Sequence, residues 1–239
     1  MDITIAGPGA VGTLLGGLLS LKGHTVTFRA RRAPAAAASS ERLRLILPDR
    51  WLSVDGTHFA GPGMPGRKPG AVLVALGRHH LHAVRRPDFP RLLGSTNALP
   101  EAPIIFFNAD PEEPVRLGLP AHQGPGSAWS LCLTLLNAVK LQDREAELTT
   151  EDPTIVAEKG SPACELLAGL SGFGFRVRAV DDAVPYSNSL FVTQLLFLPV
   201  AMCNTTLLRF LSFPEGRELA EAILSEGLET MERAGRPLA

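Results

Sequence analysis

The stretch MDITIAGPGAVG, residues 1–12, decides the fold of this chain. Residues 2–6 alternate and are partly β-branched, which predicts a short buried strand. A glycine turn follows at residues 7–12, and leucines at helical spacing then lead to Gly23, a residue type that often ends a helix. Residues 24–28 predict a second strand. Strand, turn, helix and strand together form a βαβ unit, which implies a parallel sheet.

The glycine turn has the pattern G-x-G-x-x-G, which binds the pyrophosphate of a dinucleotide. Gly7 permits a tight exit from the strand, Gly9 lets the pyrophosphate approach the backbone, and Gly12 lets helix and strand pack closely. The start of the helix offers unpaired N–H groups and the positive end of its dipole. We therefore expect the whole turn to bind a cofactor, namely Gly7, Pro8, Gly9, Ala10, Val11 and Gly12.

The end of the second strand favours NADP(H) over NAD(H). An NAD site places Asp or Glu there to bind the ribose hydroxyls, whereas this chain has Arg29, Arg31 and Arg32 and no acid before Glu41. Guanidinium groups are planar, always charged and bidentate, which suits a 2′-phosphate. The alternative is a solvated basic turn. We predict that the three arginines bind NADP(H).

The remaining sequence predicts an α/β protein: an N-terminal Rossmann-type, doubly wound, mostly parallel sheet followed by a short all-helical C-terminal domain. After Asp182 the strand pattern gives way to helical segments, so we expect an NADP-binding domain at 1–182 and a helical domain at 183–239, for substrate binding or dimerisation. The last helix is expected at 215–234. Further strands are expected at 43–47, 51–54, 71–76, 104–107, 131–141, 148–158 and 175–180, with a loop at 61–70 and a short helix at 163–170.

Composition narrows the function classes. A formal net charge of −1 offers no surface for nucleic acid. Three widely separated cysteines fit no disulfide framework or metal site, so we expect reduced, mostly buried thiols in a cytoplasmic protein without a bound metal. The start of the chain lacks the basic region of a signal peptide. Residues 183–208 carry no charge and are long enough to span a bilayer, but their polar residues favour a buried helix, expected at Leu190–Leu208.

Several segments resemble the ketopantoate reductase family. The turn G-P-G-A-V-G, then K-G-H-T-V at 22–26, then Arg31, is similar to the family's opening. Residues 72–76 resemble its fourth strand, and residues 172–182 resemble its last sheet strand. Residues 105–108 resemble the strand whose final asparagine meets the nicotinamide side of the cofactor. The resemblance implies cofactor contacts for Asn108, and for Gly77 where the family has a lysine.

The chain also departs from the family's pattern. The family places a lysine soon after the last sheet strand, as general acid to the carbonyl that is reduced, but no lysine follows Lys159 here. Gln194 falls at or near that position, and a neutral amide can hydrogen-bond a carbonyl without protonating it. Asn204 matches one of the substrate-contacting asparagines of the family. The family's further C-terminal helices are not found before Ala239.

The resemblance implies an NADP(H)-dependent oxidoreductase that transfers hydride to a small 2-keto acid or a related carbonyl, with Gln194 and Asn204 as the catalytic candidates. Two alternatives stay open: a protein that binds NADP(H) without reducing anything, and a fold reused for cofactor-independent cyclisation or isomerisation. The apolar segment of the second domain needs covering, which predicts a homodimer. We expect a small-molecule substrate and no membrane or nucleic-acid partner.

Overall fold

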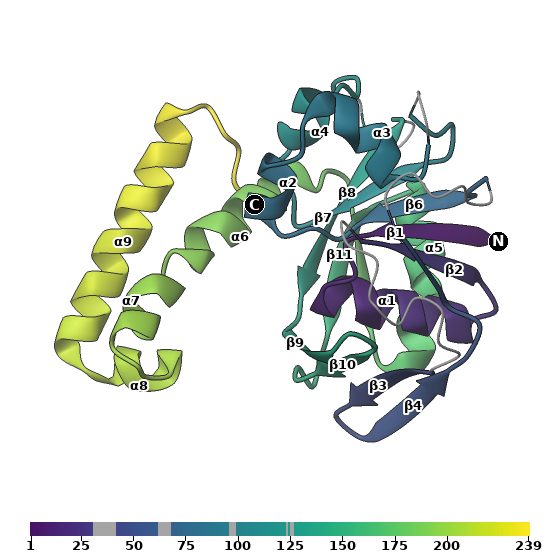
Figure 1. Ribbon diagram of the computed structural model, residues 1–239. Coiled ribbons are helices and arrows are strands. Elements are labelled where there is room, and N and C mark those ends of the chain that lie inside the picture. The colour runs from purple at the N-terminus through teal and green to yellow at the C-terminus, as the bar shows by residue number, and fades with distance from the viewer. Residues whose placement is uncertain (31–41, 62–67, 96–98, 123, 125–126) are drawn as a thin grey trace. The chain divides into compact units, whose positions relative to one another are not determined.

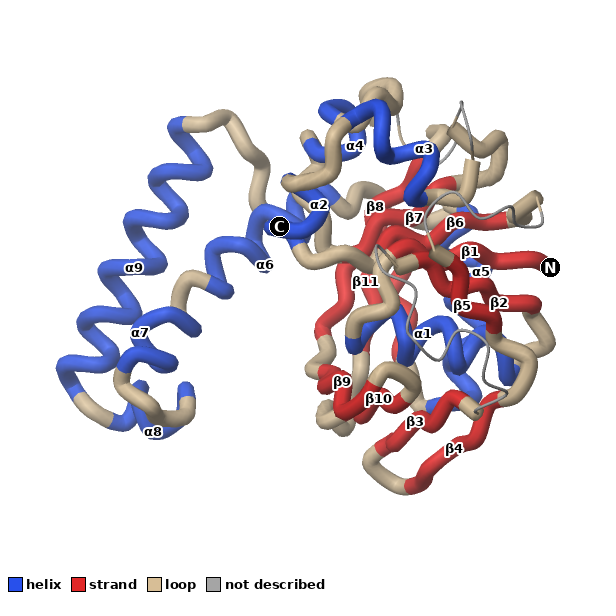
Figure 2. Tube along the Cα trace, viewed as in Figure 1, coloured by secondary structure: helices blue, strands red, loops and turns tan. Residues whose placement is uncertain are grey.

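The computed structural model describes residues 1–30, 42–61, 68–95, 99–122, 124 and 127–239. These residues divide into two compact units, 1–181 and 182–239 (Figure 1). The first unit contains two sheets with helices, and the second consists of helices and connecting turns (Figure 2).

The first unit is built on an eight-stranded sheet with the order β12-β11-β8-β7-β6-β1-β2-β5. Neighbouring strands from β5 through β8 pair in parallel, whereas β11 runs antiparallel to β8. The predicted mostly parallel sheet is confirmed. Its strands are β1 (Asp2–Ala6), β2 (Thr25–Arg29), β5 (His58–Ala60), β6 (Ala71–Val74), β7 (Ile104–Phe107), β8 (Trp129–Leu135), β11 (Thr154–Glu158) and β12 (Arg176–Val180).

The strand order places a switch point beside β1. The chain proceeds from β1 to β2 on one side and later returns to β6 on the other side. In parallel sheets of this kind, ligands bind outside the carboxyl ends of the strands at the switch point. The glycine turn follows β1 directly and therefore lies at that edge.

A second, four-stranded sheet was not expected as a separate layer. Its order is β4-β3-β10-β9, and β10 pairs in parallel with β3 and antiparallel with β9. The predicted strand 131–141 is broken at residues 136–137, and the predicted strand 148–158 at residues 149–153, because each sequence segment serves both sheets. The strands are β3 (Leu43–Leu47), β4 (Arg50–Val54), β9 (Ala138–Gln142) and β10 (Glu145–Leu148).

Helix α1 (Ala10–Leu21) packs between the two sheets, and residues 12–19 are all buried. Two adjacent glycines make this possible. A Cβ atom at Gly16 would overlap the Phe28 ring of the large sheet, and one at Gly17 would lie 2.8 Å from Leu43 and Leu45 of the small sheet. The apolar contacts of α1 therefore form one core with both sheets.

Short helices complete the first unit. Ser161 caps α5 (Pro162–Ala168) by accepting a hydrogen bond from the Cys164 N–H, which explains the start of the helix expected at 163–170. The others are α2 (Arg78–His82), the 3₁₀ helix η1 (Arg86–Asp88), α3 (Phe89–Leu92), α4 (Glu113–Arg116) and the 3₁₀ helix η2 (Gly169–Phe173).

The second unit contains α6 (Val184–Gln194), α7 (Phe197–Met202), α8 (Leu207–Ser212) and α9 (Pro214–Arg233). The last of these confirms the helix expected at 215–234. The single buried helix expected at Leu190–Leu208 was wrong: three helices share that segment. Pro199 has no N–H to continue the hydrogen bonds of α6, and Asn204 ends α7 with a φ of +47°.

The charge-free segment is also less buried than predicted. Leu198, Met202 and Leu208 have 68%, 79% and 83% of their surface exposed. None of the described helices combines the length and the apolar character required to cross a membrane.

Candidate functional site

The glycine turn between β1 and α1 has the geometry that a pyrophosphate-binding loop needs. Gly7 has a φ of +95°, and a Cβ atom there would lie 2.7 Å from the Leu76 side chain and 2.9 Å from the Ala75 carbonyl oxygen. Its N–H donates to the Arg29 carbonyl at 3.0 Å, which ties the turn to β2. Only glycine therefore suits this position.

Gly9 faces open space. It is exposed, and a Cβ atom there would meet no atom of the described residues within 4 Å. Among the described residues no side chain caps the first turn of α1, and no acidic residue lies in that turn. Unpaired N–H groups at a helix start attract an anion. The residues present therefore fit the pyrophosphate of a dinucleotide.

Gly12 sets the contact between helix and strand. A Cβ atom there would overlap the Gly7 carbonyl oxygen and would lie 3.2 Å from the Ala75 Cβ atom. The three glycines thus have the three different surroundings that the sequence pattern requires. Their contact with a cofactor stays a prediction.

The turn has a contact with Lys140 that the sequence does not predict. The Pro8 carbonyl oxygen accepts hydrogen bonds from Thr13 Oγ1 at 3.2 Å and from Lys140 Nζ at 3.0 Å. Lys140 belongs to β9 of the small sheet, which packs against α1. No local motif around Lys140 indicates this contact, because the two residues are 132 positions apart.

The arginines expected to bind the 2′-phosphate differ in position. Arg29 is only 2% exposed and donates a hydrogen bond from Nη1 to the Gly61 carbonyl at 3.3 Å. Its burial lowers the pKa of its guanidinium group. The side chain also packs against Gly94. Arg29 therefore has a structural role beside the predicted one, while Arg31 and Arg32 lie outside the described residues.

Asn108 lies just after β7 with a φ of +52°. Its Nδ2 donates to Thr134 Oγ1 at 2.7 Å, and its Oδ1 accepts from the Thr134 N–H at 2.8 Å. The amide thus joins β7 to β8 at the carboxyl edge of the sheet. Gly77 is exposed at the start of α2, three residues beyond β6. Cofactor contacts of both residues stay predictions.

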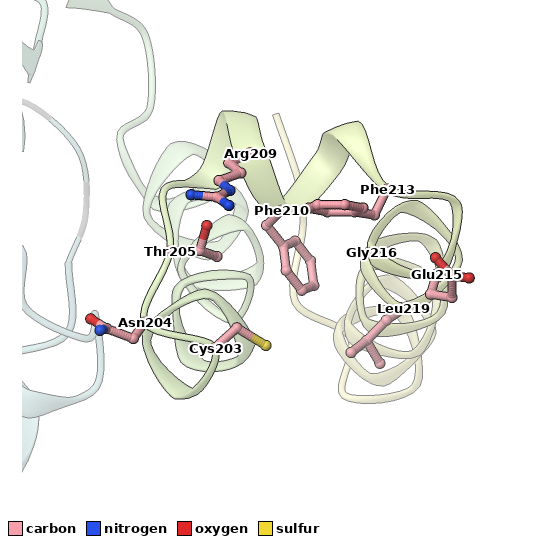
Figure 3. A pocket seen from close by; sticks show the side chains of 9 residues that line it. All are labelled: Cys203, Asn204, Thr205, Arg209, Phe210, Phe213, Glu215, Gly216 and Leu219. Carbon is pink, nitrogen blue, oxygen red and sulfur yellow. The ribbon is translucent and has the colours of Figure 1, made fainter.

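The two catalytic candidates lie in the second unit. Gln194 is the exposed last residue of α6. Asn204 is exposed and lines a pocket of about 580 Å³ together with Arg209 of α8 and residues of α9, but Gln194 does not line it (Figure 3). In that view the Phe210 ring lies in the middle of the pocket. The structure thus does not bring the two amides into one pocket.

The three cysteines are all free. Cys132 is buried, and burial raises the pKa of its thiol well above the usual range, with a further contribution from the Glu158 carboxylate. The expectation of buried thiols fails for Cys203, which is exposed on the rim of the same pocket as Asn204. No group of three or more His, Cys, Asp or Glu side chains in the described part of the chain could hold a metal ion.

Comparison with known proteins supports the family resemblance. Residues 3–94, which include the glycine turn, match the family model described as ketopantoate reductase PanE/ApbA. A search of the curated proteins finds no match.

Solved structures extend the likeness over both units. The fold is similar to 2-dehydropantoate 2-reductase from Porphyromonas gingivalis W83, with a TM-score of 0.76 and 17% identity, over 100% of this chain and 84% of that one. For the enzyme from Methylococcus capsulatus the TM-score is 0.73 at 18% identity, over 100% and 76%. For the dimeric ketopantoate reductase from Staphylococcus aureus it is 0.69 at 15%, over 100% and 76%. The resemblance to this family is confirmed; at these identities the neighbours establish the fold alone.

Proposed function

We propose that this protein is an NADP(H)-dependent oxidoreductase that transfers hydride to a small 2-keto acid or a related carbonyl. The observation that carries the proposal is the open space at Gly9, next to the uncapped start of α1 and at the switch point of the sheet. The family match over residues 3–94 includes this turn and supports the same reading.

The first unit holds the cofactor. Gly7 through Gly12 would hold the pyrophosphate, and Arg31 and Arg32 would supply charged, bidentate donors for the 2′-phosphate. When bound, the nicotinamide supplies the hydride, and the protein supplies orientation.

The second unit holds the substrate. Asn204 lines the pocket of this unit and would donate an amide hydrogen bond to a carbonyl or carboxylate oxygen. Gln194, which does not line that pocket, stays the second candidate, and neither amide can protonate the reduced oxygen. Loss of a general acid typically slows a reaction by roughly 10²–10⁴-fold. We therefore expect slow turnover, with water as the proton donor. A cytoplasmic location is part of the proposal.

The missing lysine also favours a second candidate. No lysine follows Lys159, so the chain lacks the ammonium group that the ketopantoate reductase family places after its last sheet strand. A protein that binds NADP(H) without reducing a substrate fits the same residues. Cofactor-independent cyclisation or isomerisation is the third candidate.

Titration with NADPH and NADH, followed by nicotinamide fluorescence, tests the cofactor. We expect NADPH to bind at least about tenfold more tightly than NADH, since a bidentate charged contact to the 2′-phosphate contributes roughly that factor. Arg31→Ala should remove most of this preference for NADPH. Oxidation of NADPH with a panel of 2-keto acids then tests the reaction. Binding without turnover would favour the second candidate, and absence of binding the third.

The second unit is expected to form a homodimer. Its exposed apolar side chains gather on the helices α7 and α8 and the start of α9, a pattern that marks interaction surfaces. Those more than half exposed are Phe197, Leu198, Met202, Leu208 and Phe213. The reductase from Staphylococcus aureus, which shares the fold, is dimeric.

Light scattering should therefore give a mass twice that of the 25.5 kDa chain. The double substitution Leu198→Glu and Met202→Glu should shift the protein to monomers, because two carboxylates would be buried at the interface. Trp51→Glu is the matched control, since Trp51 is 67% exposed on the first unit and should leave the mass unchanged. A wild-type monomer at micromolar concentration would contradict the dimer.

A further inference from the structure

Lys140 contacts the glycine turn although it does not belong to the glycine motif. It lies on β9, and its side chain is 30% exposed. Its Nζ donates to the Pro8 carbonyl oxygen at 3.0 Å, so an ammonium group lies against the turn that follows β1. Figure 1 shows β9 near the N-terminal end of α1, which the turn leads into.

The hydrogen bonds of this ammonium group leave room for a ligand. An ammonium group has three N–H donors. The described residues supply two partners, the Pro8 carbonyl oxygen and the Asp143 carboxylate, whose Oδ1 lies 3.4 Å away. One donor therefore remains for a group that binds on the turn.

Apart from the Asp143 carboxylate, the charges described around the turn are positive. The N-terminus of α1 carries the positive end of the helix dipole, and its first turn contains no acidic residue. A lysine beside a helix N-terminus adds a second positive charge, whereas this end of a helix normally attracts negative ones. A phosphate group would interact favourably with both.

We propose that Lys140 is a further binding residue for the cofactor, which positions the glycine turn through the Pro8 carbonyl and contacts the pyrophosphate with its remaining N–H. The inference rests on the proposed NADP(H) site and adds a residue from outside the glycine motif. The ligand class is a nucleoside diphosphate unit, since the ammonium acts on the phosphates and not on the base or the nicotinamide.

Asp143 moderates this contact. Its carboxylate, three residues after Lys140, is 71% exposed, and its Oδ1 lies 3.4 Å from the Lys140 Nζ. It competes with a phosphate for the same ammonium group. Removing the carboxylate should therefore make the lysine a stronger phosphate ligand, which is an effect in the opposite direction to the loss of the lysine.

NADPH titrations at several NaCl concentrations test the proposal. Lys140→Met should weaken NADPH binding about tenfold, while Lys140→Arg, which keeps the charge, should stay within about threefold. Salt screens exposed charges, so the affinity of Lys140→Met should fall less steeply with NaCl than that of the wild type. Asp143→Asn should tighten binding about twofold to threefold.

Lys68→Met is the matched control, because it removes one lysine charge from the same unit at an exposed pair with Glu101 and should leave NADPH binding unchanged. Wild-type affinity in Lys140→Met would overturn the proposal. Equal losses in Lys140→Met and Lys140→Arg with the wild-type salt dependence would also overturn it, because the role would then be structural only. If the wild type binds neither NADPH nor NADH, the proposed function fails as well, which the wild-type titration reveals by itself.

Discussion

Gly12→Ala is expected to destabilise the first unit by about 3 kcal/mol, the upper range of overpacking substitutions, and to remove measurable NADPH binding. The added methyl group would overlap the Gly7 carbonyl oxygen, which belongs to the backbone and cannot rotate away. To relieve this overlap, α1 must move away from β1. Such a movement would disturb the packing of α1 on both sheets. Urea unfolding followed by the fluorescence of buried Trp129 measures the loss.

Gly9→Ala separates binding from folding in the same turn. Gly9 has a φ of −74°, which alanine adopts without strain, and an added Cβ atom would meet nothing within 4 Å in the described part of the chain. Stability should therefore stay within about 0.5 kcal/mol of the wild type. NADPH affinity should nevertheless fall by about 100-fold, since the methyl group fills the space that the pyrophosphate needs. Normal NADPH binding by Gly9→Ala would show that the pyrophosphate lies elsewhere.

The second large effect is expected at a buried pair away from the glycine turn. Glu158 ends β11 with a side chain that is 1% exposed, and its Oε1 lies 2.7 Å from His122 Nε2. The His122 ring also packs on Trp129, with ring centroids 4.6 Å apart. In the described structure, His122 Nδ1 has no hydrogen-bond partner. Glu158 is therefore the polar contact that compensates the burial of this ring.

Glu158→Ala should lower the free energy of unfolding by about 3 kcal/mol, because it leaves a cavity and a largely buried imidazole, 14% exposed, without a hydrogen bond. The midpoint of urea unfolding measures this loss. Glu101→Ala is the matched control: its carboxylate is 84% exposed in an ion pair with Lys68, and its removal should leave the midpoint unchanged. Equal midpoints for the wild type and Glu158→Ala would contradict a stabilising role of the pair.

Local preferences explain what could be predicted. The first βαβ unit, the strands at 43–47, 51–54 and 104–107, and the last helix all appear within one or two residues of their expected positions. These elements depend on glycine positions and on apolar periodicity, which act over a few residues. The departure from a single helix at Leu190–Leu208 has a local cause as well, since Pro199 and the polar residues before α8 interrupt the apolar run.

The features of the candidate site also fall into two groups, those that follow from local sequence and those that depend on the tertiary structure. The amino-acid sequence alone determined the three glycines, the order of strand, turn and helix, and the absence of any lysine beyond Lys159. The tertiary structure alone decided that Arg29 is buried, that a second sheet covers α1, and that Lys140 reaches the Pro8 carbonyl. The physical reason is distance along the chain: a turn's backbone angles follow from its own residues, whereas a contact across 132 positions depends on how every strand between them pairs. The sequence therefore predicts the glycine turn, whereas the Lys140 ammonium group beside it is found only in the tertiary structure.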